Sequence, residues 1–336
     1  MKSTKLFART MGVGLAAALA VTLAACGSSG GGGANTGNPA PATTGGGAPS
    51  QGGAASGLPS GKPGQGKPPI VMGDKNFAEE YILGALYSQA LQAKGYKVTL
   101  KGNIGSSATI DKALTSGQIQ MYPEYTGVIY TELAKLGDRP KSAQATYQGA
   151  KKWEEQRGFA VLNPTPFQDA DGMATLKPFA QQHGLKTIGD LKKLGAFTYG
   201  GPPENKTRYQ GVVGLKQAYG LNQIQFKPLS IGAQYQALDQ HQVDTIAIFT
   251  TDGQLASGKY AVLKDTKGIF GYQQVVPVVK KSLIQSEGPA FSQILNAVSA
   301  SLTTDAIVAM NKAVQIDQQD PGKVAHAFLQ ANGFLS

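Results

Sequence analysis

The chain has 336 residues, of which 31 are Lys or Arg and 21 are Asp or Glu, so its formal net charge is +10. A basic balance is typical of nucleic-acid-binding proteins. Here the cations are scattered and no nucleic-acid motif accompanies them, which favours ordinary surface charge. The single cysteine, Cys26, excludes an internal disulfide.

Residues 1–25 have the pattern of a secretory signal peptide. A short basic start is followed by an apolar run over 11–25 that is too short to span a membrane. The run ends Leu-Ala-Ala-Cys, which resembles the lipobox of bacterial lipoproteins. We therefore predict that Cys26 is acylated and becomes the mature N-terminus. The protein is then exported and lipid-anchored to the outer face of the bacterial cytoplasmic membrane.

Residues 26–69 are rich in Gly, Pro and Ser and have almost no large apolar side chains. Such a composition cannot form a core, so we predict a disordered tether. The remaining chain, residues 70–336, is long enough for two domains.

The body alternates strand-like and helix-like segments. Strands are predicted at 70–73, 96–102, 118–122, 195–200, 223–229 and 243–249. Helices are predicted at 77–94, 110–114, 211–220, 232–240, 291–302, 304–314 and 321–333. This alternation indicates α/β layers with mostly parallel strands.

No recognisable catalytic or metal motif occurs in the chain. The histidines are far apart in sequence, at His183, His241 and His326, and none is paired with the cysteine. No HExxH, GxSxG or Gly-rich phosphate loop is present. We expect a binding protein without cofactor or metal rather than an enzyme; the alternative is a catalyst that uses only scattered carboxylates.

The sequence MYPEYTG at 121–127 raises the question of a pocket. Proline lacks a backbone N–H and is disfavoured inside a central strand, so we predict that a strand ends here. Tyr125 then either packs locally or lines a cavity.

Six segments together resemble the osmoprotectant-binding family, the glycine betaine/choline/carnitine substrate-binding lipoproteins of ABC importers. These segments are 73–91, 105–107, 113–127, 204–211, 235–253 and 268–278. The resemblance implies a two-domain, type II periplasmic-binding-protein-like α/β fold with two crossover segments and a ligand cleft between the domains. Domain 1 would comprise 70–169 and 274–336, and domain 2 would comprise 170–273.

The resemblance also implies an aromatic cage for a quaternary ammonium, which has no N–H and is suited to aromatic faces. Tyr125, Phe249 and Tyr272 match cage positions. Asp171 falls at a fourth cage position, where it faces the cation, caps the domain crossover or pairs with Arg208.

The ligand carboxylate would be held by Lys75 and Arg208, which match the family's positions for that role. Val128 stands where the family has a threonine hydroxyl. Ser106 and Ser107 offer further hydroxyl or backbone donors, and Asp169 completes the candidate contacts.

The resemblance thus implies the substrate-binding component of an ABC importer, with a permease and a cytoplasmic ATPase as partners. Its ligand would be a small quaternary-ammonium solute such as glycine betaine, choline or carnitine. The alternatives are the same fold with another solute, either an ergothioneine-like betaine or an apolar aromatic, or a surface lipoprotein for sensing or adhesion.

Overall fold

The structure is a computed structural model that describes residues 57–137 and 140–335. The predicted signal peptide, Cys26 and the predicted tether up to residue 56 lie outside the described residues. Within the described part of the chain, no helix has the length and apolar character needed to cross a bilayer.

The last part of the predicted tether, residues 57–69, differs from the prediction because it lies against the body. The Gly64 N–H donates to the Lys94 carbonyl at 3.0 Å, and the Lys94 ammonium donates to the Pro59 carbonyl at 3.0 Å. Leu58 packs against the hydrophobic core. These contacts order a segment that its composition alone assigns to a coil.

The first sheet has five strands in the order β2-β1-β3-β10-β4. Its strands are β1 (Ile70–Gly73), β2 (Val98–Lys101), β3 (Met121–Tyr125), β4 (Phe159–Val161) and β10 (Val275–Lys280). β1 is parallel to β2 and β3, whereas β10 is antiparallel to both β3 and β4.

The second sheet also has five strands, in the order β7-β6-β8-β5-β9. Its strands are β5 (Asp171–Leu176), β6 (Phe197–Gly201), β7 (Ile224–Pro228), β8 (Thr245–Phe249) and β9 (Tyr260–Val262). β6 is parallel to β7 and β8, and β5 is antiparallel to β8 and β9.

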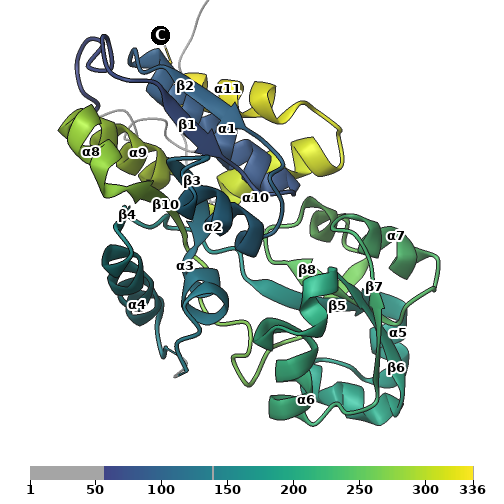
Figure 1. The fold of residues 1–336 in the computed structure, drawn as a ribbon. Helices are drawn as coiled ribbons and strands as arrows, with labels where there is room; N and C mark the ends of the chain where they lie inside the picture. The colour runs from purple at the N-terminus through teal and green to yellow at the C-terminus, as the bar shows by residue number, and fades with distance from the viewer. Residues whose placement is uncertain (1–56, 138–139, 336) are drawn as a thin grey trace, which may run out of the picture. The chain divides into compact units, whose positions relative to one another are not determined.

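Two connections join the sheets, one between β4 and β5 and one between β9 and β10 (Figure 1). The strands of the first sheet fall within 70–169 and 274–336, and those of the second fall within 170–273. The domain boundaries themselves stay a prediction.

Helices cover both faces of each sheet. The α-helices are α1 (Ala78–Ala93), α2 (Ser107–Thr115), α3 (Thr126–Val128), α4 (Ala143–Gln156), α5 (Lys177–His183), α6 (Gly214–Tyr219), α7 (Ala233–Asp239), α8 (Lys281–Glu287), α9 (Pro289–Ser301), α10 (Thr304–Gln315) and α11 (Pro321–Ala331). The other helical segments are the π-helical η1 (Ile129–Leu133) and η4 (Tyr209–Val213) and the 3₁₀-helical η2 (Ile188–Leu194), η3 (Pro203–Lys206) and η5 (Gly253–Ser257).

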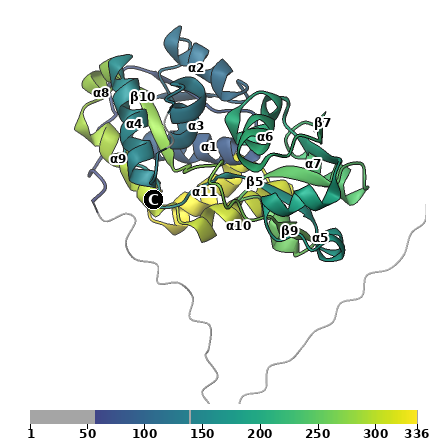
Figure 2. The same cartoon turned by 90° about the horizontal axis from the view of Figure 1, so that it is seen from below.

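The largest core lies where α1 packs on α9, α10 and α11 against the first sheet. This arrangement confirms the predicted helices at 77–94 and in the C-terminal segment. α10 and α11 lie beside α1 (Figure 2). α10 also contacts η5, which follows β8 of the second sheet. The C-terminal helices therefore belong to the core of the first sheet and touch the second.

The predicted strand at 118–122 does not end before the proline of MYPEYTG, because β3 continues to Tyr125. Pro123 lies in the middle of β3, directly opposite Pro277 of β10. A pair of opposed prolines fits a non-hydrogen-bonded position of an antiparallel ladder, where no N–H is required. On its other side β3 pairs with β1 only at Met121. The missing N–H therefore interrupts neither ladder.

Candidate functional pocket

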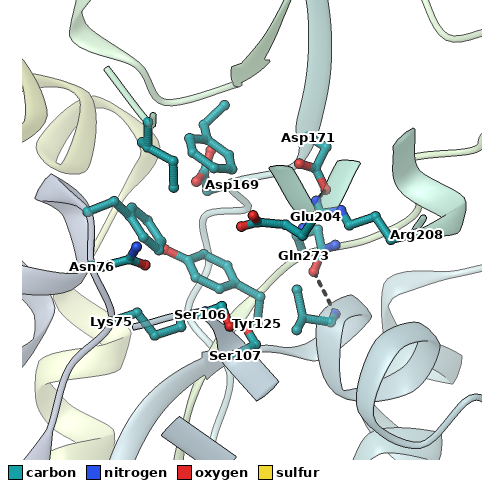
Figure 3. A pocket seen from close by; sticks show the side chains of 14 residues that line it. Lys75, Asn76, Ser106, Ser107, Tyr125, Asp169, Asp171, Glu204, Arg208 and Gln273 are labelled. Carbon is teal, nitrogen blue, oxygen red and sulfur yellow. Dashed lines mark hydrogen bonds and ion pairs between the residues drawn. The ribbon is translucent and has the colours of Figure 1, made fainter. Parts of the chain in front are cut away.

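A small pocket with a cavity volume of about 50 Å³ lies beside the ends of β1, β3, β5 and β8. Its lining residues are Lys75, Asn76, Phe77, Ser106, Ser107, Tyr125, Val128, Asp169, Asp171, Glu204, Arg208, Ile231, Phe249 and Gln273 (Figure 3). Nine of the ten predicted contact residues line it, and the tenth, Tyr272, does not.

Lys75 follows β1 and is buried with an exposed fraction of 3%. Its ammonium forms a short ion pair with Glu124 and lies 3.7 Å from the Glu80 carboxylate. It also donates to the Ser107 hydroxyl at 3.3 Å. Burial lowers the pKa of Lys75, but the charges of Glu124 and Glu80 outweigh burial and raise it. Lys75 is therefore a protonated ammonium with internal counter-ions.

Arg208 is held by two carboxylates from opposite sides of the pocket. Its Nη2 pairs with Asp171, the first residue of β5, and its Nη1 lies 3.0 Å from Glu132 of η1. Burial opposes the charge, yet Asp171 and Glu132 raise the pKa of Arg208. Of the predicted roles for Asp171, the structure shows the pair with Arg208.

Three aromatic rings form one wall of the pocket, which we call the aromatic wall: Phe77, Tyr125 and Phe249. The Phe77 ring stacks on Tyr125 with centroids 6.1 Å apart and on Phe249 at 5.3 Å. Two carbon atoms in contact are about 3.5–4.0 Å apart. A trimethylammonium therefore does not fit between Phe77 and either neighbour, and the rings offer a shared surface rather than an enclosing cage.

Local structure explains why these rings meet. Phe77 is the N-cap of α1, and Tyr125 ends β3. Phe249 ends β8, where it is paired in register with Asp171. The Lys75 ammonium lies 4.4 Å from the Tyr125 ring centroid, so the wall already contacts one cation.

Tyr272, which is predicted to belong to the cage, does not line this pocket. Its hydroxyl donates to the Lys141 carbonyl at 3.1 Å, and the residue lines a neighbouring, larger hollow that shares Asp171 with the pocket. The next residue, Gln273, lines the pocket instead, and its Oε1 accepts from the Val128 N–H at 3.1 Å. Successive side chains of a chain entering a strand point to opposite sides, which explains the exchange.

A buried carboxyl, Glu79, lies behind the aromatic wall and connects the two sides of the pocket. Its Oε1 accepts from the Tyr125 hydroxyl at 2.7 Å. Its Oε2 accepts from the Thr251 hydroxyl at 2.6 Å and from the Asn311 amide at 2.7 Å. Burial raises the pKa of Glu79, and these donors oppose the rise. Tyr125 is thereby tied to both α10 and the segment after β8.

Two further lining groups have internal partners. Asp169 accepts from the Thr251 N–H at 3.1 Å, and burial together with the Glu79 charge raises its pKa well above the usual range. Ser106 is the N-cap of α2, and its hydroxyl lies 3.3 Å from that of Thr109.

Five lining residues were not predicted from the sequence: Asn76, Phe77, Glu204, Ile231 and Gln273. Phe77 follows Lys75 by two residues inside a segment already identified as family-like. Glu204 opens another such segment, and Gln273 directly follows Tyr272. Proximity to these motifs was the available signal. In the described part of the chain, no group of three His, Cys, Asp or Glu side chains is arranged to hold a metal ion.

Comparisons with known proteins agree with this architecture. Residues 68–331 match the family model described as the substrate binding domain of ABC-type glycine betaine transport system. A glycine-betaine-binding protein of Pseudomonas aeruginosa is 32% identical over 281 residues, which cover 79% of this chain and 88% of that protein.

A solved structure of apo YehZ from Escherichia coli matches 79% of this chain and 99% of its own, with a TM-score of 0.60 and 26% identity. An ergothioneine transport permease/ergothioneine binding protein of Helicobacter pylori is 26% identical over 268 residues, covering 79% of this chain and 48% of that protein. These matches confirm the predicted periplasmic-binding-protein-like α/β fold. The chain belongs to the family of substrate-binding domains of ABC-type glycine betaine transport systems.

Proposed function

We propose that this protein captures a small quaternary-ammonium solute on the aromatic wall and delivers it to an ABC importer. Two observations support the proposal: membership of the glycine betaine transport family, and the convergence of Phe77, Tyr125 and Phe249 in one pocket. The convergence carries most weight, because it is observed in this chain itself.

The chemistry of the ligand explains the aromatic wall. A trimethylammonium group has a full charge and no N–H, so it cannot donate an ordinary hydrogen bond. One cation–π contact contributes about 0.5–1 kcal/mol when exposed and about 2 kcal/mol when desolvated. Three contacts would supply roughly 2–6 kcal/mol, against about 8 kcal/mol for micromolar binding. Binding therefore needs a further electrostatic contribution from the pocket.

The expected partners are a membrane permease and its cytoplasmic ATPase, and the expected anchor is a lipid on Cys26. Substrate-binding proteins of this family are exported, which agrees with the signal-like sequence of residues 1–25. Replacing Cys26 with Ala should release the protein from the membrane fraction of its host. If the variant stays with the membranes, the lipid anchor is not what holds it there.

A ligand panel tests the binding function directly. The panel contains tetramethylammonium, choline, glycine betaine, carnitine and ergothioneine, with 3,3-dimethylbutan-1-ol as an uncharged analogue of choline. A true ligand at a hundred times its Kd should stabilise the fold by about 2.7 kcal/mol in a thermal melt. The uncharged analogue should give no shift, because it lacks the cation. If no cation of the panel stabilises the protein, the proposed function is wrong.

Ergothioneine tests the alternative of a larger betaine, which the relative from Helicobacter pylori favours. Stabilisation by ergothioneine alone would retain the fold and the transport role but change the solute. The other alternative, a sensing or adhesion lipoprotein, predicts that deleting the gene leaves solute uptake by cells unchanged.

A further inference from the structure

The two basic side chains that line the pocket are both neutralised by the protein itself. Lys75 pairs with Glu124 and lies next to Glu80. Arg208 pairs with Asp171 and Glu132. All of these partners are at least partly buried, and Glu80 and Glu124 are completely so. Neither cation is therefore available to a ligand carboxylate without breaking an existing pair.

The geometry at Arg208 is the more restrictive of the two. A guanidinium binds a carboxylate best through two parallel N–H donors. Here Nη1 and Nη2 are directed to different carboxylates, Glu132 from the side of the first sheet and Asp171 from the second. Nε has no hydrogen-bond partner among the described residues, and neither has the Glu132 Oε1 that lies near Nη1. Glu132 does not line the pocket, but together with Asp171 it pairs with both Nη groups of Arg208, which are the groups that a ligand carboxylate would use.

The remaining charges of the pocket are acidic. Figure 3 shows the Glu204 carboxylate directed into the pocket, towards Tyr125 and Asp169. Glu204 makes no side-chain hydrogen bond or ion pair with any residue that the structure describes. Its partly exposed carboxylate lies on the same pocket as the aromatic wall, so a cation placed there gains an opposite charge and π faces together.

We propose that the pocket selects a quaternary ammonium that has no carboxylate, such as a hydroxylated trimethylammonium of the choline type. In this assignment, which rests on the proposed function, Glu204 is the counter-charge of the ligand cation. Glu132 and Asp171 exclude carboxylate-bearing solutes because they occupy Arg208 and would repel a second anion. The specificity of the site then lies in acids that surround the basic residues, rather than in the basic residues themselves.

Choline and glycine betaine are the matched probes, since they share the trimethylammonium head and differ at the other end, a hydroxyl against a carboxylate. Isothermal titration calorimetry on the full protein at pH 7.5 should give at least a tenfold lower Kd for choline, which corresponds to about 1.4 kcal/mol. Tetramethylammonium should bind more tightly than glycine betaine, although it lacks any second polar group.

Three isosteric variants assign the residues. Glu132→Gln and Asp171→Asn each remove one anion from Arg208 and should lower the Kd of glycine betaine relative to choline by about tenfold. Glu204→Gln should raise the Kd of choline and of tetramethylammonium by about tenfold. Glu155→Gln, at an exposed ion pair with Lys151 outside the pocket, is the control and should change neither Kd.

The wild-type titrations decide the proposal even if a variant fails to fold. Glycine betaine binding as tightly as choline, or more tightly, would overturn the selectivity while leaving the proposed function intact. Absence of binding by these three probes and also by carnitine and ergothioneine would instead refute the proposed function. If the wild type prefers choline but Glu132→Gln and Asp171→Asn keep the ratio unchanged in folded protein, the assignment of the excluding residues is wrong.

Discussion

The hydrogen bond between Tyr125 and Glu79 allows a quantitative test of the structure. Both side chains are buried, with exposed fractions of 4% and 2%, and their oxygens are 2.7 Å apart. Burial raises the pKa of Tyr125 well above 10, so the phenol stays protonated and donates. The Tyr125→Phe variant keeps the ring and removes only this donor.

The expected cost follows from the charge of the acceptor. A hydrogen bond to a charged group contributes about 1.5–3 kcal/mol, against about 0.5–1.5 kcal/mol for a neutral pair. Tyr87→Phe is the matched control, because the Tyr87 hydroxyl lies 2.9 Å from the neutral hydroxyl of Ser299 in the same core. At pH 8, Tyr125→Phe should therefore lower the free energy of unfolding by about 1 kcal/mol more than Tyr87→Phe does.

The difference should depend on pH in a definite direction. Burial raises the pKa of Glu79 above 4.5, and the Tyr125 donor opposes the rise. Without the Tyr125 donor, the pKa of Glu79 in the folded protein rises further. The Tyr125→Phe variant therefore loses stability relative to wild type as the pH increases through the folded-state pKa of Glu79. At pH 4 the carboxyl is protonated and the two substitutions should cost about the same.

Urea denaturation followed by circular dichroism at pH 4 and pH 8 measures both effects. The slope of the free energy of unfolding against urea concentration must be the same in wild type and variants for the comparison to be valid. Equal costs for the two substitutions at pH 8 would refute the view that Glu79 is an ionised acceptor tied to Tyr125.

Phe77→Ala should raise the Kd of tetramethylammonium about 5–30-fold through the loss of one ring. Tyr272→Ala, outside the pocket, is the control and should change this Kd less than about twofold. Calorimetry measures both, and an equal loss of affinity in the two variants would contradict the aromatic wall. Burial raises the pKa of Glu154 from 4.5 to about 8. Its contribution to stability is thus complete below pH 4.5 and falls by up to about 1.4 kcal/mol per pH unit towards pH 8. Glu154→Gln should reduce this pH dependence of the free energy of unfolding, measured by urea denaturation at several pH values. An unchanged pH dependence would count against a buried neutral carboxyl. A Cβ at Gly253 would lie 2.6 Å from the backbone of α10. Gly253→Ala should therefore lower the melting temperature by several degrees. The control Gly137→Ala, at a position where a Cβ meets no atom within 4 Å, should keep the melting temperature within about a degree of the wild-type value.

Much of the local structure follows from the sequence pattern. The apolar spacing after Phe77 predicts α1, and the last sixty residues show the period of the C-terminal helices, because one buried stripe on a helix repeats every three to four residues. Strand β5 was missed, since its sequence DGMATL begins with Asp and Gly, which are uncommon in strands. It forms because it is held between β8 and β9 in the sheet. Neighbouring strands, not its own composition, place it there.

The pocket, like the fold, could be predicted only in part from the sequence. Nine of the ten predicted contacts line it, and most of them lie in or next to the segments that resemble the family. The choice between Tyr272 and Gln273 was not accessible, since it depends on which side of the chain faces the pocket. Nor was the pairing of Arg208 with Glu132, residues 76 positions apart whose side chains meet at 3.0 Å.

By itself, then, the sequence determined the family-like motifs, the periodic helices and strands, and the residue types that suit a quaternary ammonium. Only the tertiary structure decided which rings stand together and which charges cancel. The physical reason is that periodicity reports the direction of a side chain relative to its own element, whereas a site is made of distances between elements. Those distances arise from packing across the whole chain.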